Sequence, residues 1–437
     1  MLLADLKDKR ILIWGMGKEG QACLDYFQKH NLSATIATYN DEDGPEKFAE
    51  LLKNTEVIVK SPGVSVYREE IVRAKGQGIT VTSSSDLFLN EMRANHPRTK
   101  VIGISGSKGK STSVSMLYHM LKALGVKAAL GGNIGKALID LADTDDDVVV
   151  GEFSSYQAAD LTASPHIVMF TNLFFVHSDW HHGHDNYCKD KLHLVANQKP
   201  GDLCLVNARN PQLRQYCEGI GRKEFYNLPE GFHAEGKDLF YKNDKILSIN
   251  ELKLCGDHNM ENLAGVMTIV QKLGLDVRAA AASLKSFEPL PHRLQKVTVK
   301  KGVLFINDSI STAPEAAISA IKSFDNTMAV ISGGIKNGQD YTEYAKCIEE
   351  NPKVKLVITL FQSGPEIAAA IRQHVTRKDF KLIEAETLNE AVSKAYEEMK
   401  HCGGTLVLFS PTAPSFGYYK NFMERGQDFI DNVNKLP

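Results

Sequence analysis

The sequence predicts an α/β protein of three domains, each built on a mostly parallel sheet flanked by helices. In two places an apolar strand runs through a glycine-rich turn into a helix, at residues 10–29 and 101–124. In the last third of the chain, apolar strands alternate with helices, as is typical of parallel sheets. We expect these strands at 302–308, 328–332, 354–359 and 405–409, and the helices near 314–323, 341–350, 364–374 and 388–400. The expected domains are residues 1–97, 98–290 and 291–437, with Pro289 and Pro291 marking the last boundary.

Composition narrows the class of protein. The 437 residues are 43% hydrophobic and 24% charged, with a formal net charge of −2. A nearly neutral charge argues against a general binder of nucleic acid or membrane surfaces. The seven cysteines are scattered without paired spacing, and the chain has neither a signal-peptide pattern nor an apolar run of membrane-spanning length. We therefore expect a cytoplasmic, monomeric protein that acts on small molecules, with no nucleic-acid or membrane partner.

A complete G-x-G-x-x-G follows the first strand, formed by Gly15, Gly17 and Gly20. Such glycines allow a tight turn and the close approach of a pyrophosphate to a helix N-terminus, as in Rossmann-like domains. An NAD site also requires an acidic residue at the end of the second strand. Asp41-Glu42-Asp43 follows that strand, but the pattern does not define which of the three would bind the ribose. About four parallel strands fit before residue 97, fewer than in a full dinucleotide domain. Three interpretations stay open: a diphosphate nucleotide such as a UDP-sugar, NAD, or a purely structural turn.

The second glycine turn, Gly106-Ser107-Lys108-Gly109, leads into Lys110, Ser111 and Thr112 at a helix start. The N–H groups of such a turn can bind phosphate oxygens, the lysine adds a cation, and a hydroxyl can bind Mg²⁺. The usual pattern asks for glycine where this chain has Ile104, so the spacing is a variant. The succession of strand, loop and helix predicts a P-loop that binds a nucleotide phosphate.

Residues downstream offer further ligands for a metal or a nucleotide. Glu152 ends a buried strand, at the sheet edge where a carboxylate can hold Mg²⁺ near phosphates, although it could also begin a solvated turn. Four histidines and two aspartates lie within residues 177–185. They suggest either a transition-metal site or a Mg²⁺ and phosphate site that uses one histidine and a nearby lysine. Asn259 and Asn262 share one helical face, where they could cap and pack or hold adenine and phosphates.

Several motifs in a fixed order carry a resemblance to a known family. They are Gly103 to Thr112, Gly131-Gly-Asn-Ile-Gly135, Glu152 to Gln157, Asn172 to Lys191, Gly256 to Asn262, Leu290 to Arg293, Asn307-Asp-Ser309, Ser410-Pro411 and Lys420 to Gly426. Over essentially its whole length the chain resembles the Mur ligases, and most closely the branch that adds D-glutamate to UDP-N-acetylmuramoyl-L-alanine. The resemblance implies an ATP-dependent amide ligase of peptidoglycan precursor synthesis that works through an acyl phosphate.

The resemblance also implies roles for individual residues. The catalytic residues would be Lys110, His177 and Lys191, with Lys191 carried as a carbamate. Two Mg²⁺ ions would be held by Ser111, Glu152, His177 and Lys191. ATP would be bound by Gly106, Ser107, Lys108, Gly109, Lys110, Ser111, Thr112, Asn262, Arg293 and Asp308. The UDP substrate would be bound by Gly15, Gly17, Lys18, Glu19, Gly20, Ser61, Pro62, Gly63, Asn133, Ser154 and His177. Glutamate would be bound by Thr312, Lys336, Ser415 and Phe422.

The glutamate end departs from the pattern of that branch. Ile310 stands where the D-glutamate-adding members carry a lysine, and Lys336 comes one position early in the turn after Gly333-Gly334. Phe175-Val176 also replaces acids that many members carry before the histidine. Lys336 and Lys420 are the candidates to restore the lost cation. The run from Ile310 to Pro314 resembles instead a branch that adds L-glutamate. We favour D-glutamate by its base rate, with L-glutamate as the alternative.

Three other classes remain to be separated from this interpretation. A non-catalytic UDP-sugar and ATP-binding regulator would not be expected to keep Lys110, Glu152, His177, Lys191 and Asp308 together. A folylpolyglutamate-type ligase would lack the first 97 residues. An oxidoreductase would rest on the Gly15–Gly20 turn alone. Hydrolysis of ATP that depends on a UDP-muramoyl substrate separates the regulator from the ligase.

Overall fold

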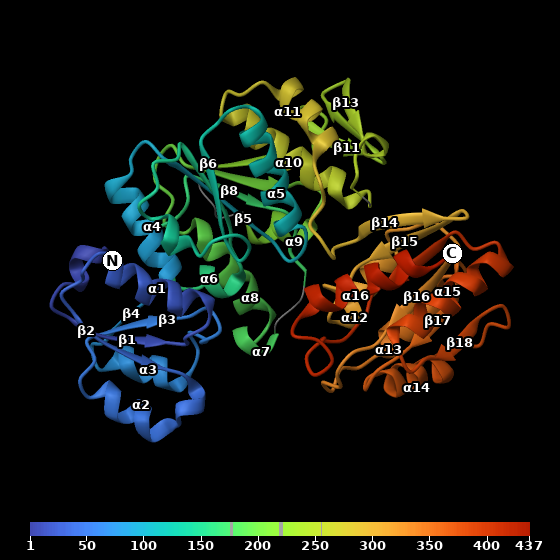
Figure 1. The fold of residues 1–437 in the computed structure, drawn as a ribbon. Coiled ribbons are helices and arrows are strands. Elements are labelled where there is room, and N and C mark those ends of the chain that lie inside the picture. Colours follow the sequence, from blue (N-terminus) through green and yellow to red (C-terminus); the bar gives the residue numbers. More distant parts are fainter. Residues whose placement is uncertain (175–177, 218–221, 255) are drawn as a thin grey trace. The chain divides into compact units, whose positions relative to one another are not determined.

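The computed structural model describes all residues except 175–177, 218–221 and 255 (Figure 1). The chain divides into two compact units. The first comprises Met1–Leu252 and His258–Phe287, and the second comprises Lys253–Asp257 and Glu288–Pro437. Both are built on parallel sheets flanked by helices, so the predicted fold class is confirmed. The predicted boundary after residue 97 falls inside the first unit, and the division into three domains stays a prediction. None of the helices in the described part of the chain is long and apolar enough to cross a membrane.

The first sheet has four parallel strands in the order β2-β1-β3-β4. Its strands are β1 (Arg10–Trp14), β2 (Thr35–Tyr39), β3 (Val57–Lys60) and β4 (Thr80–Ser83), and its helices are α1 (Lys18–Lys29), α2 (Pro45–Leu52), α3 (Glu69–Gly76) and α4 (Ser84–Asn95). Ile11, Leu12 and Ile13 are all buried, because helices cover both faces of the sheet. The glycine turn that follows β1 therefore lies at the carboxyl edge of a fully covered sheet.

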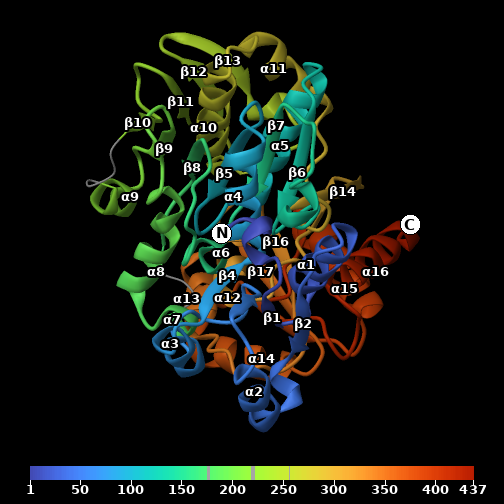
Figure 2. The same ribbon diagram turned by 90° about the vertical axis from the view of Figure 1, so that its left-hand side faces the viewer.

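The second sheet of this unit has six parallel strands in the order β10-β9-β8-β5-β7-β6 (Figure 2). Its strands are β5 (Lys100–Ser105), β6 (Ala128–Gly132), β7 (Val148–Glu152), β8 (Ile167–Phe170), β9 (Leu203–Asn207) and β10 (Lys223–Tyr226). The helices around it are α5 (Lys110–Ala123), α6 (Ser155–Ala158), α7 (Ser178–His181), α8 (His184–Leu192), α9 (Pro211–Tyr216), α10 (His258–Lys272) and α11 (Val277–Ser283). Because β5 has β7 on one side and β8 on the other, the loop after β5 lies at a topological switch point, where α/β sheets bind ligands.

The short strands and turns over residues 201–255 of the sequence predict an antiparallel edge, and this prediction is wrong for its first part. β9 and β10 extend the parallel sheet, and every residue of β9 is buried. A strand buried on both faces belongs inside a covered sheet rather than at a solvated edge. The antiparallel strands are β11 (Phe232–Glu235), β12 (Asp238–Tyr241) and β13 (Asp244–Ser248), which form a small sheet of their own.

The second unit has a six-stranded sheet in the order β14-β15-β19-β16-β17-β18, in which only the β14 pairing is antiparallel. Its strands are β14 (Gln295–Lys300), β15 (Val303–Asn307), β16 (Met328–Ser332), β17 (Val354–Thr359), β18 (Lys381–Glu384) and β19 (Leu406–Phe409). Its helices are α12 (Pro314–Ile321), α13 (Thr342–Glu350), α14 (Gly364–His374), α15 (Leu388–Cys402) and α16 (Phe422–Lys435). The four predicted strands are confirmed, whereas β14, β18 and α16 were not predicted.

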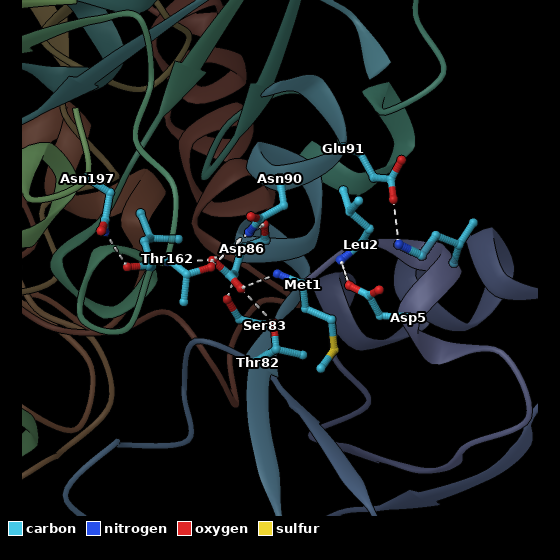
Figure 3. Close-up of polar contacts among 12 residues, drawn as sticks. Met1, Leu2, Asp5, Thr82, Ser83, Asp86, Asn90, Glu91, Thr162 and Asn197 are labelled. Carbon is cyan, nitrogen blue, oxygen red and sulfur yellow. Dashed lines mark hydrogen bonds and ion pairs between the residues drawn. The ribbon is translucent and has the colours of Figure 1, made fainter. Parts of the chain in front are cut away.

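A buried carboxylate fastens the first sheet to the second inside the first unit (Figure 3). Asp86, in the first turn of α4, is 1% exposed. Its Oδ1 accepts hydrogen bonds from the N–H of Thr162 at 2.6 Å and the hydroxyl of Thr162 at 2.8 Å. Its Oδ2 accepts from the Thr82 hydroxyl at 2.9 Å, and the Met1 amine lies 3.9 Å away. One side chain therefore joins the end of the first sheet to the loop before β8.

Asp86→Ala should lower the free energy of unfolding of the first unit by about 3 kcal/mol, because the N–H of Thr162 and the buried hydroxyl of Thr82 would lose a charged acceptor. Both tryptophans, Trp14 and Trp180, lie in this unit, so urea denaturation followed by tryptophan fluorescence measures it. Asp145→Ala is the matched control, since that side chain is 93% exposed, and its effect should stay within about 0.5 kcal/mol. Equal effects of the two substitutions would contradict the prediction.

Candidate active site

The loop between β5 and α5 can be built only with glycine at two of its positions. Gly106 has φ +146° and Gly109 has φ +83°, and side chains strain such backbone. A Cβ atom at Gly106 would lie 1.9 Å from Oγ1 of Thr171. A Cβ atom at Gly109 would lie 2.5 Å from Nδ2 of Asn262. Conformation and space therefore both exclude a side chain, which leaves the loop backbone bare at the start of α5.

Two residues after β8 fix the shape of this loop. The N–H of Lys108 donates to Oδ1 of Asn172 at 2.8 Å, and Nδ2 of Asn172 donates to the Lys108 carbonyl at 3.0 Å. The Ser107 N–H donates to the Asn172 carbonyl at 3.0 Å. The Thr171 hydroxyl donates to the Lys108 carbonyl at 2.7 Å. The sequence predicted no role for Thr171 or Asn172, although Asn172 begins one of the motifs quoted above.

Two lysines converge on one carbonyl oxygen of the loop. Nζ of Lys110 donates to the Gly106 carbonyl at 2.8 Å and to the Ser107 carbonyl at 3.1 Å. Nζ of Lys191, from α8, donates to the same Gly106 carbonyl at 3.1 Å. Lys191 is 2% exposed, and burial, followed by the charge of Lys110, holds the pKa of its amine well below the usual range. The structure thus brings together two lysines that the sequence predicted for one site, about 80 residues apart.

Glu152 ends β7, which is paired with β5, and its carboxylate is 1% exposed. Its Oε1 accepts a hydrogen bond from Nδ2 of Asn133 at 3.2 Å. Its Oε2 is buried and has no hydrogen-bond partner among the described residues. A buried carboxylate oxygen without a donor is costly unless a cation meets it. Ser111, which is also buried, lies in the first turn of α5, so the residue types present fit a hard cation such as Mg²⁺.

The histidine-rich segment is only partly described. His177, predicted to position a metal or the acyl phosphate, lies outside the described residues, as do Phe175 and Val176. In the parts of the chain that the structure describes, no group of three or more His, Cys, Asp or Glu side chains is placed to hold a metal ion. His181 is fully buried and is hydrogen-bonded to Asp190 and Ser155 rather than aimed at an open site. The described part of the segment therefore provides no transition-metal site.

The glycine turn after β1 is tightly packed against its neighbours. Gly15 has φ +91°, and a Cβ atom at Gly20 would lie 2.0 Å from the Gly15 carbonyl oxygen. The Ser61 hydroxyl donates to the same carbonyl. The Gly63 carbonyl accepts a hydrogen bond from Nε1 of Trp180 at 3.2 Å. Gly17 stands at the N-cap of α1, with open space where a Cβ would be. The turn, Ser61, Pro62 and Gly63 thus lie together at the carboxyl edge of the first sheet.

Lys18 and Glu19, in the first turn of α1, already contact the loops of the second sheet. Nζ of Lys18 donates to the Gly135 carbonyl at 2.7 Å, and Oε1 of Glu19 accepts from Nε2 of Gln157 at 2.5 Å. The Ser84 hydroxyl donates to the other oxygen of Glu19. Gln157 in turn accepts from the Ser154 N–H at 2.9 Å. The two predicted substrate contacts therefore link the first glycine turn to Ser154 and to the loop that carries Asn133.

In the second unit, polar side chains gather after the adjacent strands β15 and β19. Asp308 is 4% exposed, and burial raises the pKa of its carboxyl to about 6, against hydrogen bonds from Ser311, Leu294 and Ser410 and the charge of Arg293, which lower it. Arg425 is fully buried and donates to the Ser309 carbonyl at 2.8 Å and to the Ala413 carbonyl at 2.9 Å. Arg425 was not predicted as a site residue, although it belongs to the Lys420 to Gly426 motif.

The predicted glutamate contacts do not all lie in this group. Ser415 is buried, and the Phe422 carbonyl accepts a hydrogen bond from the Ser309 hydroxyl at 2.8 Å. The Thr312 carbonyl accepts from Nε2 of Gln339 at 3.1 Å. Nζ of Lys336 lies 2.6 Å from Oε1 of Glu366, and its side chain is 62% exposed. Within the second unit, Lys336 therefore has an acidic partner, and its contact with glutamate stays a prediction.

Comparison with known proteins agrees with this arrangement. Two family models match the chain: the Mur ligase middle domain over residues 104–270, and the Mur ligase, glutamate ligase domain over residues 292–413. A UDP-N-acetylmuramoyl-L-alanine–L-glutamate ligase of Xanthomonas axonopodis pv. citri is 33% identical over 451 residues, covering 98% of this chain and 96% of the relative. The enzyme of the same name from a Micromonospora species is 33% identical over 465 residues, covering 99% and 98%.

Solved structures show the same fold at low identity. The UDP-N-acetylmuramate–alanine ligase of Thermotoga maritima has a TM-score of 0.57 at 17% identity, covering 98% of this chain and 99% of that one. The MurF ligase of Thermotoga maritima in complex with ADP has a TM-score of 0.59 at 16% identity, covering 99% and 96%. The predicted resemblance is confirmed along the whole length, and the chain belongs to the Mur ligases, a family of ATP-dependent enzymes that form amide bonds.

Proposed function

We propose that this enzyme joins glutamate to UDP-N-acetylmuramoyl-L-alanine at the expense of ATP. The observation that carries the proposal is the identity of 33%, over 98% of the chain, to a ligase named for that product. The glycine loop before α5 carries no side chains at Gly106 and Gly109 and has Lys110 beside it, which supports the proposed use of ATP. The domains at residues 1–97, 98–290 and 291–437 would bind the UDP group, ATP and glutamate in that order. No other partner is required, and we propose a cytoplasmic monomer.

The proposed reaction has two steps. A carboxylate oxygen of the alanyl residue attacks the γ-phosphorus of ATP, and the bond to the bridging oxygen breaks to release ADP. The glutamate amine then attacks the acyl phosphate, and the tetrahedral intermediate expels phosphate as the amine loses a proton. Both steps bring anions together, so they need neutralised charge and alignment more than proton transfer. The N–H groups of Gly106–Gly109, the N-terminus of α5 and Lys110 would supply that environment.

We assign the proposed metal sites to Ser111, Glu152, His177 and Lys191. When bound, Mg²⁺ would neutralise phosphate oxygens. The unpartnered Oε2 of Glu152 is the oxygen that such a cation would satisfy. Asn133, which donates to the other oxygen of Glu152, would hold the carboxylate in place and also contact the muramoyl substrate. The remaining proposed ATP contacts are Asn262, Arg293 and Asp308.

The burial of Lys191 supports a chemical modification of its amine. An amine attacks carbon dioxide only when it is neutral, and burial keeps this amine neutral at a lower pH than usual. The N–C bond forms, the amine loses a proton, and a cation becomes an anionic carbamate. This change would place a negative charge beside Lys110, whose cation now lowers the pKa of the amine. We therefore propose a carbamate at Lys191 as a ligand of the second Mg²⁺.

For the amino acid, we propose L-glutamate, with D-glutamate as the alternative. The prediction in favour of D-glutamate rested on base rate, and the relatives quoted above are named for the L isomer. Ile310 gives the site no cation at the position where the D-glutamate branch has one, and Lys336 is paired with Glu366. Thr312, Lys336, Ser415 and Phe422 remain the proposed contacts of the amino acid.

Phosphate release from ATP and Mg²⁺ should require both UDP-N-acetylmuramoyl-L-alanine and glutamate, and should be at least 10-fold faster with L-glutamate than with D-glutamate. Mass spectrometry of the product identifies the added residue. Lys110→Ala is the negative control and should lower kcat at least 100-fold, because the phosphates lose their nearest cation. Turnover with D-glutamate alone would overturn the choice of isomer, and no turnover with either would overturn the proposed function.

Lys191→Ala should lower kcat at least 100-fold, and a short carboxylate such as formate should restore part of the rate by taking the place of the carbamate. Lys189→Ala is the matched control, since that lysine is exposed on the same helix, and its rate should stay within twofold of wild type. ¹³C NMR of the wild type in ¹³C-bicarbonate should show a carbamate signal that Lys191→Ala lacks. Full activity of Lys191→Ala would refute the carbamate.

The buried Asp308 should make the stability of the second unit depend on pH. The pKa of its carboxyl is about 6 when folded, above its ordinary value of 3.8. The stabilisation is complete below about pH 3.8 and is lost as the pH rises through 6, to an extent of about 3 kcal/mol. Hydrogen exchange of the β15 and β19 amides, corrected for intrinsic rates, should show this loss in the wild type between pH 4 and 7. Asp308→Asn should remove it, and an equal pH dependence in both proteins would contradict the assignment.

A further inference from the structure

Four side chains form a hydrogen-bonded row in the first unit; three of them are buried and the fourth, Tyr67, is half-buried. The Tyr67 hydroxyl donates to the two carboxylate oxygens of Asp190 at 3.0 and 3.1 Å. Nδ1 of His181 lies 2.6 Å from Oδ2 of Asp190, and Nε2 of His181 lies 2.9 Å from the Ser155 hydroxyl. His181 is fully buried, Ser155 is 3% exposed and Asp190 is 7% exposed. We call these four residues the relay; of them, the sequence suggested a role only for His181, as one of the four histidines of a metal site.

The relay connects three segments that the proposed function needs. Tyr67 follows Ser61–Gly63, the proposed diphosphate contacts, and Ser155 directly follows Ser154, the proposed muramoyl contact. Asp190 directly precedes Lys191 on α8, and His181 ends α7 (Figure 1). Trp180 adds a second link, since its carbonyl accepts from the Ser65 hydroxyl at 2.8 Å. A shift of any one of these segments must therefore break a hydrogen bond of the relay.

One tautomer of His181 gives all of these hydrogen bonds a consistent direction. Asp190 accepts from Tyr67, so its carboxylate is also the natural acceptor for an N–H at Nδ1 of His181. In a neutral imidazole of this tautomer Nε2 is an acceptor, and the Ser155 hydroxyl then donates to it. This order of serine, histidine and aspartate is also that of a hydrolase triad. Here the serine is almost fully buried, so its oxygen is not accessible to a substrate. The arrangement is therefore suited to holding segments in place rather than to nucleophilic attack.

We propose that His181 and Asp190 are positioning residues, which hold the Ser154–Ser155 turn and the start of the diphosphate loop in fixed relation to Lys191. The relay would act as one unit, because Asp190 has two donors and His181 uses both ring nitrogens. Loss of either end frees the same interior pair and lets α8 move relative to the Ser154–Ser155 turn. This inference rests on the proposed function, through the roles given to Ser154 and Lys191.

A double-mutant cycle tests the relay. Tyr67→Phe and Ser155→Ala should each lower kcat about 10-fold and leave the KM for glutamate within twofold. Because both break one unit, the double variant should also lose about 10-fold. The two side chains bond to different residues, so a purely local role would give independent effects, about 100-fold in the double variant. Multiplied effects, or no effect of either single substitution, would overturn the proposal.

Tyr216→Phe is the matched control for this cycle. The Tyr216 hydroxyl also donates to a carboxylate of α8, at 2.7 Å to Oδ1 of Asp185, yet it lies outside the relay. Its kcat should stay within twofold of wild type. Circular dichroism and thermal denaturation of every variant show whether a loss of rate reflects unfolding instead.

A second measurement does not depend on activity. In protein labelled with ¹⁵N-histidine, the His181 signals should show a protonated Nδ1 and an acceptor Nε2. Asp190→Asn should move the proton to Nε2, because the amide can donate to Nδ1. His181→Gln, which removes the signals, assigns them. A wild-type His181 with its proton on Nε2 would overturn the relay. No turnover by the wild type would refute the proposed function, whereas an active enzyme whose variant effects multiply would refute the relay alone.

Discussion

The structure of the first unit depends on the convergence of two lysine amines on the glycine loop before α5. Lys110 and Lys191 point at one carbonyl oxygen of the glycine loop, and burial and repulsion both weaken the protonation of Lys191. Across the pair β5–β7, one oxygen of Glu152 lacks a donor among the described residues. The phosphates, the metal ion and the carbamate that we propose would each contact one of these groups. These ligands would complete an arrangement that the fold already holds in place.

In the second unit, Arg425 connects two loops that are distant from each other in the sequence. It donates to backbone carbonyls at Ser309, after β15, and at Ala413, after β19. Burial lowers the pKa of this guanidinium to about 10, yet it stays a cation at neutral pH. The charge lies beside Ile310, where the resemblance leads one to expect a lysine. A fixed cation in the scaffold thus stands near the position where the side chain of the family pattern is missing.

The sequence was sufficient for the fold class and for the glycine loops, because both depend on local patterns. The strand before Gly15 and the one before Gly106 are short apolar runs, and a helix follows each turn. The place of β9 in the parallel sheet was missed, since a buried run of five residues has the same pattern in either orientation. The contacts of Lys18 with Gly135, of Lys336 with Glu366 and of Asp190 with His181 were also missed. Each joins residues whose approach is set by packing rather than by spacing in the sequence.

The steric closure of the glycine loop also limits how this enzyme can change. At Gly106 the obstacle to a larger residue is the hydroxyl of Thr171, and at Gly109 it is the amide of Asn262. Asn262 is itself a proposed nucleotide contact. A smaller residue at this position would make room for a side chain at Gly109, but it would also weaken the proposed binding of the nucleotide. Few single substitutions in residues 106–109 would therefore leave the enzyme active. Resistance to a compound that binds the backbone of this loop would be correspondingly hard to acquire.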